Sequence, residues 1–370
     1  MILKDLKLKN FRNINDVDIE FSNNFNIIYG KNGSGKTNLV ESIYILALTK
    51  SFRTNKDDNL INNLEKDSNL FIEGTIQTKL DTKYKIMLNK SSKQLFIDNV
   101  LCSKVSDYIS NINVILFNPE DVFLVNETPT ERRRFINIEL SKINKKYFQA
   151  LAKYNKILKM RNSYLKIQKN KESISLNYLN VLTENLIKVG LEISDYRFQF
   201  IKDINLYLNE IYKKIFSYGN LEVRYESKYL NKTSKDILND YNKVLDKEIL
   251  YKKTLLGIHH DDFLFYLDDN LIKEYGSIGQ QKNSILSFKL SEIEVLKKYE
   301  LDKPILILDD LFSELDVDKI KNILSLLSND LQIFITSTDK DKFNFIKDKD
   351  YKLFNVKEGK IVEEENGKQS

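Results

Sequence analysis

The chain has 370 residues, of which 42% are hydrophobic and 30% are charged. This composition excludes global disorder, and the length predicts two or three domains, or one large head with an insertion. One cysteine, Cys102, excludes an internal disulfide framework, and no apolar run is long enough for a signal peptide or a membrane span. We therefore expect a cytoplasmic protein.

The net charge of +5 hides an uneven distribution of charged residues. Residues 127–256 carry a net charge of +11, and the rest of the chain carries −6. Within residues 132–171 there are 13 basic residues and a single acid, Glu139. A basic segment on an acidic body is typical of proteins that bind nucleic-acid phosphates. The alternative, a solvated face of a lysine-rich protein, does not account for the near-absence of acids.

The N-terminal part is predicted to consist of strands around one helix. Alternating or fully apolar patterns predict strands at residues 3–11, 17–21, 25–29, 70–78, 83–88 and 94–97. Between the third and fourth of these strands, apolar residues with helical spacing predict a helix over residues 38–48.

A helical hairpin is predicted in the middle of the chain. From Glu131 to Ile157, apolar residues step alternately by four and three. The same rhythm runs from Leu179 to Ile211, after a polar stretch at residues 168–175. At about 1.5 Å per residue, the first helix would reach only roughly 50 Å, so the hairpin is short. The lysines off the apolar seam should point outward, and we predict that DNA is bound by Lys145, Lys146, Lys153, Lys156 and Lys159.

The C-terminal part returns to alternating strands and helices. Strands are predicted at residues 221–225, 263–272, 305–308 and 333–336, with a turn inside the second of them. A helix is predicted over residues 286–298. The tail from Glu358 is polar, and we expect it to be loose.

A glycine-rich segment before the first helix matches the phosphate-binding pattern G-x-x-x-x-G-K-[ST]. Its residues are Gly30, Lys31, Asn32, Gly33, Ser34, Gly35, Lys36 and Thr37. Glycines let backbone N–H groups face a phosphate, and the helix presents its positive N-terminus to the same group. We expect Lys36 to reach the β- and γ-phosphates of ATP, and Thr37 to bind Mg²⁺.

The apolar strand at residues 305–308 delivers two adjacent carboxylates, Asp309 and Asp310. Open α/β sheets bind ligands at the carboxyl ends of their strands. Asp309 is suited to hold Mg²⁺, and Asp310, pointing the other way, to act as the general base for an attacking water. A lone acidic pair is commonly a solvated turn, but the upstream phosphate loop favours the catalytic interpretation.

Further motifs follow along the chain. They are Asn10-Phe11-Arg12-Asn13, then Phe117-Asn118-Pro119-Glu120-Asp121 with Pro129 and Arg132-Arg133, then Gly257-Ile258-His259-His260-Asp261-Asp262, Tyr275-Gly276-Ser277-Ile278-Gly279-Gln280-Gln281-Lys282 and Ser313-Glu314-Leu315-Asp316. In this order they resemble the motifs of the RecF family of ABC/SMC-type ATPases. The chain departs from the family pattern at Asn137, His260 and Ile278, where the family usually has Asp, Arg and a polar residue. The two adjacent histidines do not match a zinc-binding pattern, so we expect a structural role beside Asp261.

The resemblance implies an α/β fold, a P-loop ABC-type ATPase head with a mixed sheet and antiparallel strands, and an inserted, mostly helical lobe. It implies that Arg12 lies near the nucleotide. It also implies that Ser277, as a catalytic residue, acts with Gly279 and Gln280 on the γ-phosphate held by the opposite subunit of a head-to-head dimer. We place the head in residues 1–126 and 257–370, and the DNA-binding lobe in residues 127–256.

For function, the resemblance implies DNA replication and repair. ATP would drive dimer formation, the dimer would bind gapped or duplex DNA, and slow, DNA-stimulated hydrolysis would release it. The implied partners are RecR and RecO, with which the protein would load RecA. A transporter ATPase would carry a switch histidine, a structural SMC protein needs hundreds of heptad residues, and a nuclease-linked ATPase needs an acidic metal-binding domain. An SMC-like or other ABC-type DNA-associated ATPase of an unrelated pathway is the alternative.

Overall fold

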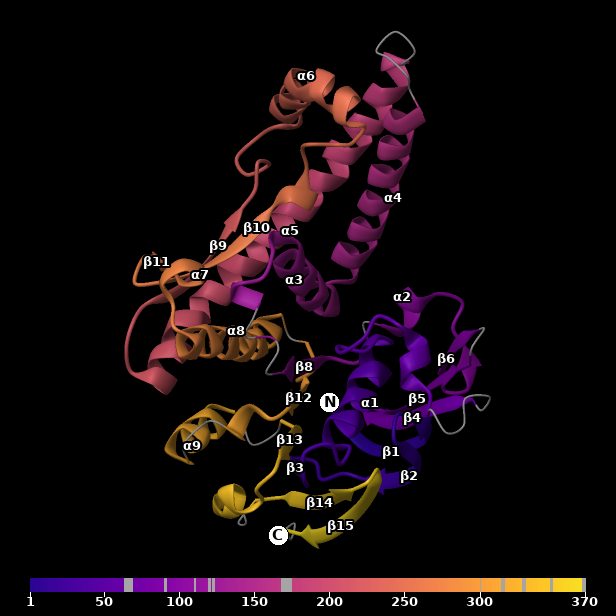
Figure 1. The fold of residues 1–370 in the computed structure, drawn as a ribbon, viewed down its shortest axis with the longest axis vertical. Helices are drawn as coiled ribbons and strands as arrows, with labels where there is room; N and C mark the ends of the chain where they lie inside the picture. The colour runs from indigo at the N-terminus through magenta and orange to yellow at the C-terminus, as the bar shows by residue number, and fades with distance from the viewer. Residues whose placement is uncertain are drawn as a thin grey trace. The chain divides into compact units, whose positions relative to one another are not determined.

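The computed structural model describes residues 1–62, 69–89, 92–109, 111–118, 121, 124–167, 175–299, 301–313, 317–327, 331–346 and 349–367. The chain divides into two compact units (Figure 1). The head unit comprises Met1–Asp121 and Glu292–Ser370, and the helical unit comprises Val122–Ser291. Within the described residues, no helix has both the length and the apolar character needed to span a membrane.

A mixed six-stranded sheet lies at the centre of the head unit. In spatial order its strands are β15 (Lys360–Asn366), β14 (Tyr351–Lys357), β3 (Phe25–Tyr29), β13 (Ile333–Ser337), β12 (Ile305–Leu308) and β8 (Val114–Phe117). All pairs are parallel except that of β15 with β14 at one edge. Strands β12 and β13 are buried along their whole length, as a parallel strand covered on both faces must be. The carboxyl ends of β3, β13 and β12 therefore meet at one edge of the sheet.

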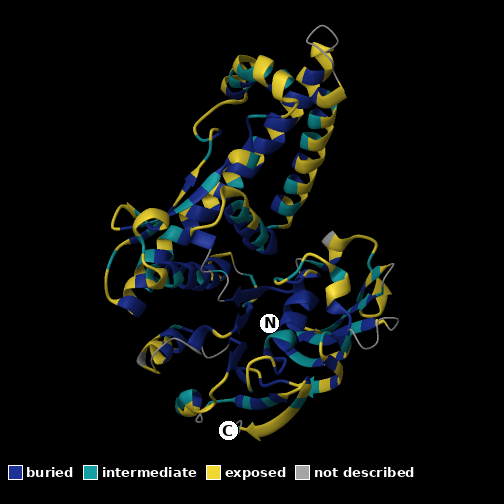
Figure 2. Ribbon diagram, viewed as in Figure 1, coloured by how far each residue is buried: buried dark blue, intermediate teal, exposed yellow. Residues whose placement is uncertain are grey.

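A second, antiparallel six-stranded sheet completes the head unit with the helices around it. In spatial order its strands are β2 (Ile14–Glu20), β1 (Ile2–Phe11), β4 (Leu70–Gln77), β5 (Asp81–Leu88), β6 (Lys93–Ile97) and β7 (Val100–Leu101). The helical elements are α1 (Lys36–Leu48), α2 (Val105–Tyr108), α9 (Val317–Leu326), and the 3-10 turns η1 (Asp57–Leu60), η5 (Leu311–Ser313) and η6 (Asp341–Ile346). Because α1 packs against strands of both sheets, it is buried on nearly all sides (Figure 2).

The helical unit combines long helices with a three-stranded antiparallel sheet. Its helices are α3 (Pro129–Ile143), α4 (Lys145–Ile167), α5 (Leu176–Phe216), α6 (Ser234–Tyr251), α7 (Ile272–Tyr275) and α8 (Ile278–Lys298), which continues into the head unit. The sheet contains β11 (Asn270–Leu271), β10 (Asp262–Leu267) and β9 (Leu221–Glu226), and the 3-10 turn η4 (Ile258–His260) precedes β10. Helices α4 and α5 pack together as the predicted hairpin (Figure 1). The hairpin turn that we predicted at residues 168–175 lies almost entirely outside the described residues.

The first arm of the hairpin is not the single helix that we predicted. Asn144 has an extended backbone, with φ −138° and ψ 99°, and ends α3. Its side-chain oxygen then accepts a hydrogen bond from the N–H of Tyr147 and so caps the first turn of α4. The apolar steps of four and three continue across this break, so periodicity alone concealed it.

The described part of the C-terminal tail, residues 358–367, is not loose, because most of it forms a strand. Glu358 and Gly359 have positive φ angles of 49° and 77° and form the turn between β14 and β15. Most of β15 is exposed, three of its seven residues are glutamates, and Lys352 pairs with Glu363 across the hairpin. Backbone pairing with β14 and charge pairs hold this strand. It therefore needs no buried apolar side chains, and the alternating apolar pattern that predicts a strand is missing from its sequence.

The boundary of the helical unit also differs from our expectation at its C-terminal side. Residues 257–291, which we assigned to the head, group with the helices. Strand β10 pairs along its length with β9, and Asp262 at its start binds Arg132 of α3. These contacts join the segment to the helical unit although it carries the motif at residues 275–282, which we call the signature motif.

Several basic residues of the 132–171 segment are structural. Arg132 pairs with Asp262, Arg161 with Glu248, and Lys142 with Glu139. Two of the acids lie outside the segment, which is why its sequence appeared almost free of acids. The buried guanidinium group of Arg197 on α5 pairs with Asp261 and donates to the carbonyl oxygen of Ile258. These contacts attach the motif at residues 257–262, which contains both histidines, to α5 in the helical unit.

Candidate nucleotide-binding site

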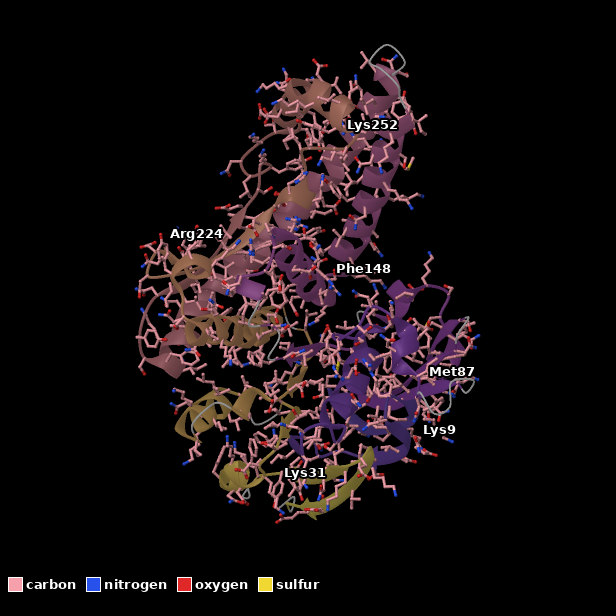
Figure 3. The ribbon with its side chains drawn as sticks, viewed as in Figure 1. Lys9, Lys31, Met87, Phe148, Arg224 and Lys252 are labelled. Atoms are coloured by element: carbon pink, nitrogen blue, oxygen red, sulfur yellow. The ribbon has the colours of Figure 1, made fainter. Side chains whose placement is uncertain are left out.

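The phosphate-binding pattern forms a tight loop between β3 and α1. Gly33 and Gly35 have φ angles of 78° and 116°, which side chains rarely adopt. A Cβ atom on Gly30 would lie 2.3 Å from the carbonyl oxygen of Val356 on β14. Lys31, Asn32 and Gly33 form the exposed rim of the loop, and Figure 3 labels Lys31. The loop can curl in this way only with glycines at these positions.

The Lys36 side chain folds back over the loop. Its Nζ donates hydrogen bonds to the carbonyl oxygens of Gly30, at 2.8 Å, and Lys31, at 2.9 Å. Burial lowers the pKa of Lys36, and the charges of Asp310 and Asp309 oppose this shift. The buried Oγ of Ser34 in the same loop has no hydrogen-bond partner among the described atoms. A cationic amine and an unsatisfied hydroxyl beside curled backbone suit a bound phosphate chain.

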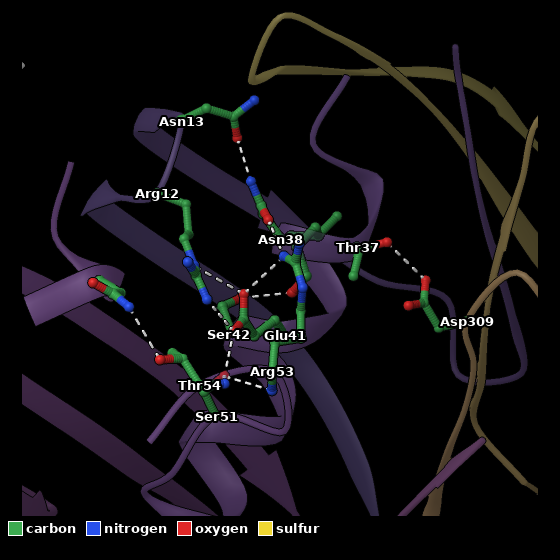
Figure 4. Close-up of polar contacts among 12 residues, drawn as sticks. Arg12, Asn13, Thr37, Asn38, Glu41, Ser42, Ser51, Arg53, Thr54 and Asp309 are labelled. Atoms are coloured by element: carbon green, nitrogen blue, oxygen red, sulfur yellow. Dashed lines mark hydrogen bonds and ion pairs between the residues drawn. The ribbon is translucent and has the colours of Figure 1, made fainter. Parts of the chain in front are cut away.

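Thr37 and Asp309 meet at the carboxyl edge of the mixed sheet. The hydroxyl of Thr37 donates to Oδ1 of Asp309 at 3.1 Å (Figure 4). Thr336 on β13 donates to the same oxygen at 2.7 Å. Burial raises the pKa of Asp309, and the hydrogen bonds from Thr336 and Thr37 oppose the rise. A hydroxyl and a carboxylate in contact beside a phosphate loop are the protein ligands that Mg²⁺ takes in P-loop ATPases.

Asp310 follows Asp309 directly but differs from it in backbone conformation and in exposure. Its backbone is left-handed, with φ 50°, and its N–H donates to the hydroxyl of Thr336 at 2.8 Å. The residue is exposed, whereas Asp309 is buried. Directly after β12, the chain therefore presents one buried carboxylate in contact with Thr37 and, next to it in the sequence, one exposed acid.

A second polar cluster surrounds Glu41 on α1. Arg12 makes two hydrogen bonds to this buried carboxylate, at 3.1 and 2.7 Å, and Ser51 donates a third. Arg53 lies 3.4 Å from the same carboxylate and donates to Asn38 (Figure 4). Arg12, predicted near the nucleotide, is thus fixed to the helix that begins at the phosphate loop.

The signature motif lies in the helical unit. Ser277 and Gln280 form a capping box at the start of α8: the N–H of Gln280 donates to Oγ of Ser277, and the N–H of Ser277 donates to Oε1 of Gln280. Ile278 and Gly279 occupy the first turn, so the helix begins eight residues before the predicted start at 286. The side chain of Gln280, predicted to contact nucleotide, is engaged in this cap.

The predicted DNA-binding lysines all lie on α4. They are Lys145, Lys146, Lys153, Lys156 and Lys159. Each of these lysines is exposed, and none forms an ion pair with another described residue. Their outward direction agrees with the prediction from the apolar seam.

The chain matches the family model for the RecF/RecN/SMC N terminal domain over residues 2–362. It is 37% identical to the DNA replication and repair protein RecF of Ligilactobacillus salivarius (strain UCC118), over 98% of each chain. It is 39% identical to RecF of Clostridioides difficile (strain 630), over 99% of this chain and 100% of that one. The chain belongs to the RecF family. The resemblance inferred from the motifs is thereby confirmed.

Solved structures agree with the RecF assignment. The recombination mediator protein RecF, in a structure described as RecF-ATP in the RecFOR pathway, matches with a TM-score of 0.89 at 28% identity over 98% of each chain. An Smc head bound to the C-winged helix domain of ScpA matches with a TM-score of 0.58 at 14% identity over 98% of each chain. The second match shows the fold alone. Together they confirm the predicted α/β fold of an ABC-type ATPase head.

Some polar residues of this RecF-family site escaped the sequence analysis. Thr336 lies opposite Asp309 because β13 and β12 are parallel and pair Ile335 with Leu308. Its only signal was a hydroxyl residue ending an apolar strand. Glu41 and Arg53 carried no signal, because an acid inside a helix and an arginine in a loop are usually solvated. The motif Ser313-Glu314-Leu315-Asp316 lies outside the described residues except for the backbone of Ser313.

Proposed function

We propose that this protein binds and slowly hydrolyses ATP as a switch for binding DNA in recombinational repair. The contact of Thr37 and Thr336 with Asp309, directly beside the folded-back Lys36, carries this proposal. Lys36 and the loop N–H groups would hold the phosphates of ATP, and Thr37 with Asp309 would hold Mg²⁺, which neutralises charge on the phosphates. Asp310, exposed beside Lys36, is the group placed to take a proton from water.

We further propose that ATP joins two copies head to head. Ser277 at the start of α8 would face the γ-phosphate held by the other copy, with Gly279 beside it. Membership of the RecF family supports this arrangement. The active site is then incomplete in a single copy, so hydrolysis requires the dimer. Light scattering with and without a non-hydrolysable ATP analogue tests the point, because a monomer under both conditions contradicts it.

The exposed lysines of α4 are proposed to bind the phosphates of gapped or duplex DNA. No acidic side chain of the described chain pairs with them, and lysines bind the phosphate backbone, which carries no sequence information, so we expect their contribution to binding to be independent of sequence. The proposed partners are RecR and RecO, and the proposed outcome is loading of RecA. Support for these partners comes from the RecF relatives, one of which is described in the RecFOR pathway.

The DNA proposal is tested by replacing Lys153 and Lys156 with Glu. DNA affinity should fall for all sequences, and the slope of log affinity against log salt should fall by about 0.9 for each lost phosphate contact. The matched control is Lys79→Glu with Lys104→Glu, two exposed lysines of the head unit with the same change in charge. Equal loss in both double variants would show a general charge effect, and an unchanged slope in the first would remove α4 from DNA binding.

A further inference from the structure

Three basic side chains gather at the 3-10 turn η4 of the helical unit. His260 lies in the turn and is exposed. Arg133 reaches the turn from α3, and its guanidinium group donates to the carbonyl oxygen of Asp261 at 2.7 Å. Lys228, two residues after the end of β9, is also exposed. We call His260, Arg133 and Lys228 the η4 cluster.

The pairing of β9 with β10 brings Lys228 to the turn. Asp262, the first residue of β10, pairs with Glu226, the last residue of β9. In an antiparallel pair each step back along one chain matches a step forward along the other, so Lys228 lies opposite His260. The positive charges of Lys228 and Arg133 both act on the His260 ring. Three separate segments therefore place basic groups around one exposed residue.

Within the described residues, no carboxylate forms an ion pair with the η4 cluster. The two acids beside the turn have other partners, because Asp261 pairs with Arg197 and Asp262 pairs with Arg132. The half-buried Arg133 donates only to neutral acceptors, a backbone carbonyl and a threonine hydroxyl. A guanidinium group that is partly withdrawn from water without an anionic partner is stabilised by an anion that reaches it.

Phosphate oxygens suit this set of donors. Guanidinium, ammonium and imidazolium groups all donate charge-assisted hydrogen bonds to phosphate. The turn is also attached to the helix that carries the exposed lysines, since the hydroxyl of Tyr154 on α4 is hydrogen-bonded to Nδ1 of His259 at 2.8 Å. A duplex held by α4 offers further phosphates to the neighbouring surface of the same unit.

We propose that the η4 cluster binds a backbone phosphate of DNA and that His260 takes up a proton from solvent as the phosphate binds. This inference rests on the DNA binding proposed above and adds to it a contact outside α4. Lysine contacts alone do not make DNA affinity depend on pH near neutrality, because ammonium groups stay protonated there. The histidine therefore distinguishes this contact from that of the α4 lysines.

The groups around His260 determine the direction of the effect. Partial burial lowers the pKa of His260, and the positive charges of Arg133 and Lys228 lower it further. A hydrogen bond with the Thr254 carbonyl and the charge of Asp261 oppose this shift. The ring is therefore mostly neutral in the free protein at pH 7 and above, and a bound phosphate, being an anion, raises the pKa again.

The first test measures the affinity for a labelled duplex by fluorescence anisotropy at pH 8, 7 and 6, at constant ionic strength and with a non-hydrolysable ATP analogue. Affinity should rise about 5- to 10-fold from pH 8 to pH 6, because the complex holds more protons than the free protein. His260→Gln should bind as the wild type does at pH 8 and lose the rise. His260→Arg should bind tightly at every pH.

Further variants separate the η4 cluster from other basic groups. Lys153→Glu with Lys156→Glu on α4 should weaken binding at every pH and keep the rise toward pH 6. Lys228→Gln should lower the slope of log affinity against log salt by about 0.9. Lys232→Gln, in the same loop, is the matched control and should leave the slope unchanged, because Lys232 already pairs with Asp240.

Proton uptake itself is measured by NMR with ring-labelled histidine, because the chain contains only two histidines. Burial lowers the pKa of His259 to about 4, so the signal that titrates closer to neutral pH belongs to His260. A duplex should raise the midpoint of this signal by about one pH unit. Inorganic phosphate and polyglutamate, at the same ionic strength, are the competing anions.

The outcomes distinguish this inference from the DNA proposal. If the wild type binds no duplex, the DNA proposal itself fails. If it binds the duplex but the His260 midpoint stays the same, or the rise in affinity survives in His260→Gln, only the present inference is overturned. A midpoint raised by inorganic phosphate or polyglutamate and not by the duplex also overturns it, because the cluster then binds a different anion.

Discussion

Each unit of the molecule contains a cluster of buried charge, and the two clusters differ in how they are closed. In the helical unit, Arg161 of α4 and Glu248 of α6 are both almost completely buried, and every branch of the guanidinium group donates to a buried partner. In the head unit, Glu41 is equally buried, yet its partner Arg53 keeps 41% of its side-chain surface exposed. The first cluster is sealed, and the second opens to solvent next to the phosphate loop.

The difference in exposure indicates that the two buried ion pairs have different roles, one in stability and one in ligand binding. A sealed ion pair between two helices holds those helices together, because separating it leaves an uncompensated charge in an apolar interior. Polar groups that border a ligand site must stay accessible, so they contribute less to stability and more to binding. We therefore expect substitutions in the head site to change nucleotide chemistry and those in the helical cluster to change folding.

The largest effect is expected for Lys36→Ala. Its amine is the cation placed over the phosphate loop, and loss of charge-assisted hydrogen bonds to two phosphates should weaken ATP binding by at least about 100-fold. Titration with a fluorescent ATP analogue measures the affinity. Lys31→Ala, on the exposed rim of the same loop, should retain it. Normal affinity in Lys36→Ala would contradict the assignment of the site.

The next effect concerns hydrolysis alone. Asp310→Asn removes the proposed general base while Asp309 and Thr37 stay in place, so ATP should bind and its turnover should fall by about 10²–10⁴. Phosphate release under single-turnover conditions measures the rate, and Asp309→Asn should instead weaken the Mg²⁺-dependent part of binding. Wild-type turnover in Asp310→Asn would move the base elsewhere, with Glu314, outside the described residues, the first alternative.

The sealed cluster is tested by Arg161→Met. The substitution leaves Glu248 buried without its cation, and the free energy of unfolding should fall by about 3–5 kcal/mol. Arg53→Met should cost at most about 1 kcal/mol, because Glu41 keeps Arg12 and Ser51 and the lost pair is half-exposed. Urea denaturation of both variants measures the difference. Equal losses would remove the distinction between the two clusters.

The smallest effect is a pH dependence from the helical unit. Burial lowers the pKa of His259 to about 4, and Tyr154 binds its Nδ1. The unfolded chain takes up a proton near pH 6.5 and the folded chain does not, so stability is complete above that pH and is lost as the pH falls toward 4. From pH 7 to 5 we expect a loss on the order of 1–2 kcal/mol that His259→Asn reduces. Denaturation at both pH values checks this, and equal slopes would exclude His259 as the cause.

The sequence by itself determined the parts of the protein whose signals are local. The phosphate loop, the buried strand ending in Asp309 and Asp310, and the apolar seams of α4 and α5 each appear within a short stretch of residues. A glycine loop needs its glycines at fixed spacing, and a buried strand or an amphipathic helix needs its apolar residues at a fixed period. These motifs, in order, also placed the chain in the RecF family.

Only the tertiary structure decided which distant residues meet. Thr336 completes the Asp309 contact because two parallel strands align their ends, and Arg161 finds Glu248 because α4 and α6 pack together. The break at Asn144 and the β14–β15 hairpin were also decided by hydrogen bonds that compete with the local pattern. Such pairings depend on the folded path of the chain, since a buried polar group needs a partner in space and not at any given spacing. The sequence therefore identified the phosphate loop with Asp309 and Asp310, and only the fold showed that Thr336 holds Asp309 in place.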